Sequence, residues 1–147
     1  VTHPGGREYF ERIGSPEWYL KRRESVGKQH WESLKAAIQE GVKIALGTDQ
    51  MPFEPNDGTT STVREAEAYV EAGMTPLQAL RSATIESATM LRAQRDIGSL
   101  EAGKYADILA VNADPLKNIS ALRNIVMIMK GGTVYRNASA DTIASGP

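Results

Sequence analysis

Cysteine is absent from the 147 residues of this chain, which excludes disulfides, thiolate nucleophiles and cysteine metal ligands. Histidine is nearly as scarce: only His3 and His30 are present. Neither sign of charge dominates, because 17 basic side chains are balanced by 18 acidic ones. A near-neutral chain without a basic face predicts neither nucleic acid nor an anionic membrane as a partner.

Long hydrophobic runs are also missing. None approaches the ~20 residues needed to cross a bilayer, and residues 1–6 do not follow the pattern of a secretion signal. We therefore expect no membrane segment and a cytoplasmic location. The chain fits one domain but is too short for a complete eight-fold β/α barrel, which needs about 250 residues. It also lacks an initiator methionine, so we expect a piece of a longer protein.

The most informative segment is Gly41-Val-Lys-Ile-Ala-Leu-Gly-Thr-Asp49. Its apolar residues from Val42 to Leu46 predict a buried strand that runs into a carboxylate. In parallel α/β folds the C-terminal ends of the strands carry the chemistry, so Asp49 is a candidate metal ligand or proton acceptor. A turn or helix-capping aspartate is the alternative, because Asp is common where a strand becomes a loop.

Helices are expected on both sides of this segment. Ser15-Pro16-Glu17 resembles a helix start with Ser15 as the N-cap. Helical spacing predicts a helix from near Lys28, or a broken one from Pro16, that ends at Gly41, a typical C-terminal glycine. Further helices are predicted from about Thr62 and over residues 76–91. The latter begins with a capping box at Thr75, and its expected buried face is Leu77, Leu80, Ala83, Thr84 and Leu91.

Short strands follow after about residue 95. We predict them at residues 107–112, 125–130 and 133–136. Gly131-Gly132 has the composition of a two-residue hairpin turn between the last two strands. Residues 118–122 are expected to form one helical turn.

A series of short segments, taken in order, resembles a known enzyme family. Besides residues 41–49, the segments are Glu-Ala-Gly-Met-Thr-Pro-Leu-Gln-Ala-Leu at 71–80, Ala-Thr-Ile-Glu-Ser-Ala at 83–88, Ile-Gly-Ser-Leu at 97–100, Gly-Lys at 103–104, Ala-Asp-Ile at 106–108 and Asp-Pro-Leu at 114–116. Over about residues 28–136 the chain is similar to the C-terminal portion of a metal-dependent amidohydrolase, in the branch of imidazolonepropionase-like enzymes and prolidase-like peptidases.

The resemblance implies a fold and an activity. Such enzymes have a distorted TIM-type (β/α) barrel with divalent metal, usually zinc, beside a small β-sandwich. We therefore expect an α/β fold in which residues 1–95 are the C-terminal part of the barrel (its last strand and flanking helices), residues 96–137 are part of the sandwich, and residues 138–147 are a flexible tail. The implied reaction is hydrolysis of a carbon–nitrogen bond in a small amide, cyclic amide or peptide-like substrate.

Asp49 matches the family's catalytic aspartate, which binds metal and accepts a proton from the metal-bound water. A metal can lower the pKa of its water from about 15.7 to about 7, and a nearby carboxylate can pass the proton to the leaving nitrogen. Gly58, in the long loop of residues 50–61, is a candidate for shaping the substrate pocket. A solvated loop without such a role is the alternative.

The family's metal-binding histidines are missing from this sequence. His3 lies in a glycine-rich loop and His30 in the helix before the strand, so both fit surface positions better than metal ligation. Catalytic zinc normally has three protein ligands, which Asp49 alone does not supply. We therefore expect a chain that is inactive by itself and that associates with the rest of the barrel or with itself. The alternative function is a metal-free α/β binding or assembly module.

Overall fold

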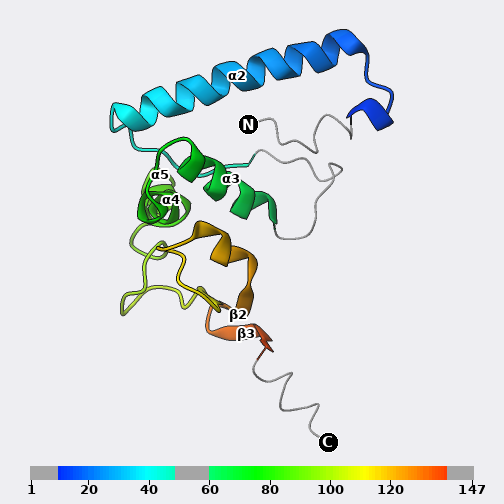
Figure 1. Ribbon diagram of the computed structural model, residues 1–147. Helices are drawn as coiled ribbons and strands as arrows, with labels where there is room; N and C mark the ends of the chain where they lie inside the picture. Colours follow the sequence, from blue (N-terminus) through cyan, green and yellow to red (C-terminus); the bar gives the residue numbers. More distant parts are fainter. Residues whose placement is uncertain (1–9, 49–59, 139–147) are drawn as a thin grey trace, which may run out of the picture.

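The computed structural model describes residues 10–48 and 60–138. Figure 1 shows the long helix α2 across the top, the shorter helices α3, α4 and α5 beneath its C-terminal end, and a small sheet at the other side of these helices. The elements are α2 (Glu17–Gln39), α3 (Thr60–Glu71), α4 (Pro76–Ala83), α5 (Ile85–Met90), β1 (Ile108–Val111), the 3₁₀ helix η1 (Ile119–Arg123), β2 (Ile125–Lys130) and β3 (Thr133–Asn137). This is a mixed α/β fold.

The long helix α2 is unbroken and mostly exposed. It begins at Glu17 with Pro16 as the N-cap, which makes no side-chain capping bond, so the predicted cap at Ser15 is wrong. Proline supplies only its fixed φ, and the chain enters the helix one residue later than expected. The C-terminal end is as predicted, because Gly41 follows it with φ +68°.

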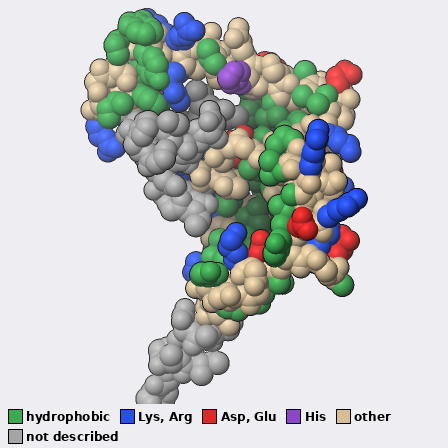
Figure 2. Space-filling view, turned by 180° about the vertical axis from the view of Figure 1, so that it is seen from behind, with side chains coloured by type: hydrophobic (Ala, Val, Ile, Leu, Met, Phe, Trp, Pro, Cys, Tyr) green, Lys and Arg blue, Asp and Glu red, His purple; other side chains and the backbone are tan. Residues whose placement is uncertain are grey.

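The N-terminal end of α2 carries hydrophobic side chains at its surface. Trp18 is 67% exposed and the nearby Ile13 is 56% exposed. Arg23 lies over the ring of Phe10, 4.1 Å from its centroid. Figure 2 shows hydrophobic side chains gathered over this end of the helix. Only Leu20 and Gly27 of α2 are buried, so little tertiary packing supports this half of the helix.

The predicted strand at residues 42–46 is not formed as a strand: the segment has no regular secondary structure and is not paired. Residues 42–48 belong to no strand ladder within the described part of the chain. A β-strand is defined by backbone hydrogen bonds to a neighbouring strand. No strand among the described residues pairs with this segment. Ile44 and Leu46 nevertheless pack against the core.

The core lies between α3, α4 and η1. Its buried members are Ala66, Tyr69, Met74, Ala79 and Ile119, and the partly buried residues packed against it come from α2, residues 42–48, α3, α4 and η1. Helix α3 begins close to the predicted position. The core therefore joins the helical region to η1, which connects β1 to β2.

The region of residues 76–91 forms two helices instead of one. The capping box at its start is confirmed, because Thr75 accepts a hydrogen bond from the Gln78 backbone and the Gln78 side chain accepts one from the Thr75 backbone. The helix breaks at Thr84, where φ is −126° and ψ is −94°. The Thr84 hydroxyl donates to the Leu80 carbonyl, and such side-chain bonds compete with regular helix.

The break changes which residues are buried. Three residues expected on the buried face are exposed instead: Leu77 is 54% exposed, Leu91 is 66% exposed, and Thr84 is exposed as well. Ala79, Ser82 and Ala88 are the buried positions of α4 and α5. The predicted face is therefore wrong at these three positions. Leu91 lies beyond the break at Thr84, whereas Leu77 lies before it, in the first turn of α4.

The sheet is a three-stranded antiparallel meander in the order β1-β2-β3. Its strands and the turn η1 are close to their predicted ranges. Gly131 and Gly132 form the hairpin turn with φ of 55° and 82°, which residues with a side chain adopt reluctantly. The Gly131 N–H also donates to the Asp107 carboxylate at 2.7 Å. The described residues contain no parallel strand pair, and none of their helices is long and apolar enough to span a membrane.

Candidate active site

Two helices hold the segment that leads toward Asp49. The Leu46 N–H donates to the Ser82 carbonyl of α4 at 3.0 Å. At the start of the segment the Val42 N–H donates to the Ala37 carbonyl at 2.9 Å. Residues 42–48 thus reach Thr48 on a fixed course. Asp49 itself lies outside the described residues, as do Gly58 and His3.

Ser82 is the centre of the α4 contact. It is 1% exposed, and its hydroxyl donates to the Ala79 carbonyl at 2.7 Å. Its own carbonyl accepts from Leu46 N–H and from the Ser87 hydroxyl at 2.6 Å. Sequence reasoning missed this residue, since a serine in an amphipathic helix gives no signal that it is buried.

A tyrosine and a glutamate of α3 lie close to the next residue of the segment, Gly47. Tyr69 is 6% exposed. Burial raises the pKa of Tyr69, and the negative charge of Glu65 raises it further. Burial also raises the pKa of the Glu65 carboxyl, while the Tyr69 hydrogen bond opposes this rise. The sequence analysis singled out neither residue.

A second glutamate of α3, Glu67, connects this helix to η1, which lies between β1 and β2. We call Glu67, Ser120 and Arg123 the Glu67 cluster. Glu67 accepts from the Ser120 hydroxyl at 2.6 Å, from Arg123 Nε at 2.9 Å and from Arg123 Nη2 at 2.6 Å. The hydrogen bonds from Arg123 lower the pKa of Glu67. Glu67 and Arg123 lie 56 positions apart in the sequence, and no sequence motif marks their pairing.

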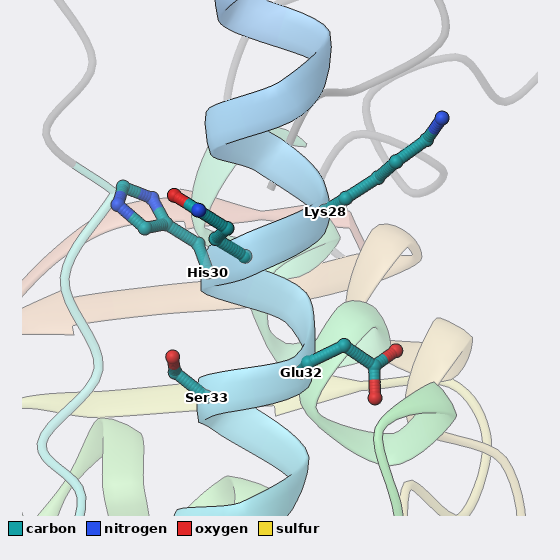
Figure 3. Close-up of a pocket in the computed structure, with 5 residues that line it drawn as sticks. Lys28, His30, Glu32 and Ser33 are labelled. Carbon is teal, nitrogen blue, oxygen red and sulfur yellow. The ribbon is translucent and has the colours of Figure 1, made fainter.

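The surface hollow on α2 does not have the geometry of a binding site. It is lined by Lys28, Gln29, His30, Glu32 and Ser33, all of them exposed. Figure 3 shows Lys28 and Glu32 pointing to one side of the helix, and His30 and Ser33 to the other. Side chains that diverge into solvent do not converge on a ligand. His30 therefore has the surface position expected for it.

The described residues do not supply a metal site by themselves. Within residues 10–48 and 60–138 no group of three His, Asp or Glu side chains is placed to hold a metal ion. Any site that includes Asp49 needs further ligands from outside these ranges, because catalytic zinc normally has three protein ligands.

Comparison with solved structures places the chain among hydrolases. A crystal structure of a Xaa-Pro dipeptidase with methionine bound in its active site superposes with a TM-score of 0.77 and 36% identity, over 89% of this chain and 32% of that one. Residues 11–135 match the amidohydrolase family. The chain belongs to the amidohydrolase family, which confirms the predicted resemblance.

Curated relatives support this assignment. Ochratoxinase from Aspergillus niger is 32% identical over 118 residues, which are 77% of this chain and 23% of that protein. Imidazolonepropionase from Shouchella clausii is 33% identical over 105 residues, which are 69% of this chain and 23% of that protein. The chain therefore spans about a quarter of the length of these relatives.

Proposed function

We propose that this chain is the C-terminal portion of a metal-dependent hydrolase that cleaves carbon–nitrogen bonds in small amides, cyclic amides or peptide-like substrates. The family match over residues 11–135 carries this proposal. It is supported by the similarity to a Xaa-Pro dipeptidase and an imidazolonepropionase. On this proposal residues 1–95 complete a β/α barrel, residues 96–137 belong to a β-sandwich, and residues 138–147 form a tail.

Asp49 is the proposed metal ligand and general base. A divalent cation, zinc by preference, supplies a more acidic water when it is bound. The Asp49 carboxylate accepts the proton and delivers it to the leaving nitrogen, a role that contributes about 10²–10⁴-fold to such reactions. Gly58 is proposed to shape the substrate pocket in the loop that follows. Asp49 alone does not complete a zinc site, so on this proposal the remaining metal ligands come from outside this chain.

The metal content and the hydrolytic activity of the complete protein test this proposal. The purified protein should hold stoichiometric divalent metal by elemental analysis and should hydrolyse members of a panel of Xaa-Pro dipeptides and cyclic amides. The Asp49→Asn variant should lower both metal content and turnover, the latter by about 10²–10⁴-fold. Asp96→Asn is the matched control, because Asp96 is exposed.

Two results would count against the proposal. Full metal content and full turnover in Asp49→Asn would remove Asp49 from the chemistry. A complete protein that binds no metal at any loading would instead support the metal-free binding or assembly module.

A further inference from the structure

We propose that a cleft beside α4 binds a small monocarboxylate that carries a short, branched apolar group. The cleft has a volume of about 140 Å³ and lies between the C-terminal end of α2, residues 41–44, α4 and the start of α5. All the residues that line it belong to the described part of the chain. The inference is independent of the proposed hydrolase activity, because it involves neither Asp49 nor a metal.

The inner wall of the cleft is apolar. Ile38, Ile44 and Met74 line it, and each of them belongs to the hydrophobic core or packs against it. Close packing in the core holds such side chains in fixed positions. A branched aliphatic group placed against this wall gains free energy by leaving water, whereas a polar group would lose its hydrogen bonds to water.

Two polar side chains of the lining are already bonded within α4 and its cap. The Ser82 hydroxyl donates to the Ala79 carbonyl at 2.7 Å, and the Gln78 side-chain oxygen accepts from the Thr75 backbone at 2.8 Å. The charged side chains of the cleft are therefore the stronger partners for a polar group of a ligand.

Three charged side chains of the lining, Lys43, Arg81 and Glu86, form what we call the charged rim. Arg81 Nη2 lies 3.1 Å from Glu86 Oε1, and Lys43 Nζ lies 4.0 Å from Glu86 Oε2. Two cations and one carboxylate leave the rim with a net positive charge, which is complementary to a monoanion. The Lys43 side chain is 83% exposed, so its ammonium can turn toward a ligand without breaking a strong ion pair.

The volume of the cleft limits the size of the ligand. A protein cavity of about 150 Å³ holds benzene, so roughly six to eight non-hydrogen atoms fit into a cleft of this size. The compound 3-methylbutanoate combines this size with a branched apolar end and one carboxylate. For a ligand this small we expect a Kd of about 1 mM.

NMR titration of the 147-residue chain with 3-methylbutanoate tests the inference. Saturable shifts of backbone amides are expected at residues 41–44 and 74–86. Two compounds of the same shape are the controls: uncharged 3-methylbutanamide and cationic 3-methylbutylamine should each bind about tenfold more weakly, because neither offers an anion to the rim. Absence of a saturable shift up to about 20 mM, far above the expected Kd, would overturn the inference, as would equal binding of the amide.

Substitutions in the charged rim separate charge from shape. Lys43→Gln should weaken the binding of 3-methylbutanoate by about 2- to 5-fold. Glu86→Gln should strengthen it by about the same factor, because the rim then loses its negative charge. Lys21→Gln is the matched control and should change nothing, since Lys21 is 73% exposed, lies 3.9 Å from Glu17 and does not line the cleft.

The direction of the Glu86 effect is the sharpest criterion. Weaker binding in a folded Glu86→Gln variant would overturn the charge complementarity, as would equal losses in Lys43→Gln and Lys21→Gln. The amide spectrum of each variant shows whether it folds as the wild type does. The comparison of the three ligands needs no substitution and therefore decides the inference even where a variant does not fold.

Discussion

Replacing Glu67 by glutamine should destabilise the protein by about 2 kcal/mol at neutral pH. Glu67 accepts three hydrogen bonds from Ser120 and Arg123, and bonds to charged groups contribute about 1.5–3 kcal/mol each. The Glu67 and Arg123 side chains are 20% and 36% exposed, so solvent screening reduces the total well below the sum. Glutamine keeps one acceptor but turns an amide toward Arg123. For a chain of this size about 2 kcal/mol corresponds to about 4–8 °C in Tm.

The loss of stability in Glu67→Gln should depend on pH, and the direction of this dependence follows from the pKa of Glu67. Arg123 lowers the pKa of Glu67 below its ordinary value of 4.5, so the folded state holds the proton less strongly than the unfolded state. The stabilisation by Glu67 is therefore complete above about pH 5 and is lost as the pH falls through the lowered pKa of the folded state. Wild type and Glu67→Gln should differ most at pH 7 and should converge in strong acid.

Urea unfolding followed by circular dichroism measures this difference. The melts are compared at pH 7, 5 and 3, with Glu71→Gln, an exposed glutamate of the same helix, as the control. Equal stability of wild type and Glu67→Gln at pH 7 would refute the reasoning. A difference that stays constant down to pH 3 would assign the loss to packing instead of charge.

Two further substitutions test local features of the fold by the same unfolding assay. An added Cβ at Gly98, where φ is +94°, would lie 2.6 Å from Ala88 Cβ, so Gly98→Ala should lower the free energy of unfolding by about 3 kcal/mol. Gly103 has φ +92° but open space around it, so the control Gly103→Ala should lower it by only about 1–2 kcal/mol. Equal losses of stability in the two variants would disprove the close approach of Gly98 to Ala88. Thr75→Ala removes the helix cap and should cost about 1 kcal/mol, while Thr75→Ser should be nearly neutral; a similar loss in both would assign the effect to the methyl group.

Local signals in the sequence were read correctly where neighbours in sequence are also neighbours in space. The capping box at Thr75, the left-handed Gly41 after α2 and the Gly131-Gly132 turn each depend on residues within four positions. Their backbone requirements are the same whatever packs around them. These features could therefore be predicted before any tertiary contact was known.

Features decided by distant contacts were not predictable in this way. The burial of Leu77 and Leu91 depends on which other elements pack over them, and a hydrophobic period in the sequence does not encode that. The pairing of Glu67 with Arg123 joins residues 56 positions apart. Likewise, the apolar run at residues 42–46 predicted a strand, but a β-strand also needs a neighbouring strand to bond to, and no strand among the described residues pairs with it.

The same holds for the candidate site. The family resemblance pointed to Asp49 from sequence, and that assignment remains a proposal because Asp49 lies outside the described residues. Ser82, whose carbonyl bonds to Leu46 in the segment before it, and the buried Tyr69 carried no sequence signal. A buried tyrosine or serine is recognised only when the helix that bears it is packed against its partner.

The central position of β2 has a consequence for how this chain must be handled. Its sequence, Ile-Val-Met-Ile-Met-Lys, has little charge and no proline or glycine, which are features of segments that form cross-β fibrils. In the folded sheet both edges of β2 are bonded, to β1 and to β3, so its backbone offers no template. Arg123 and Lys130 stand at either end as charged gatekeepers. Any condition that separates β3 from β2 exposes an edge of β2 and therefore favours fibril formation as well as unfolding.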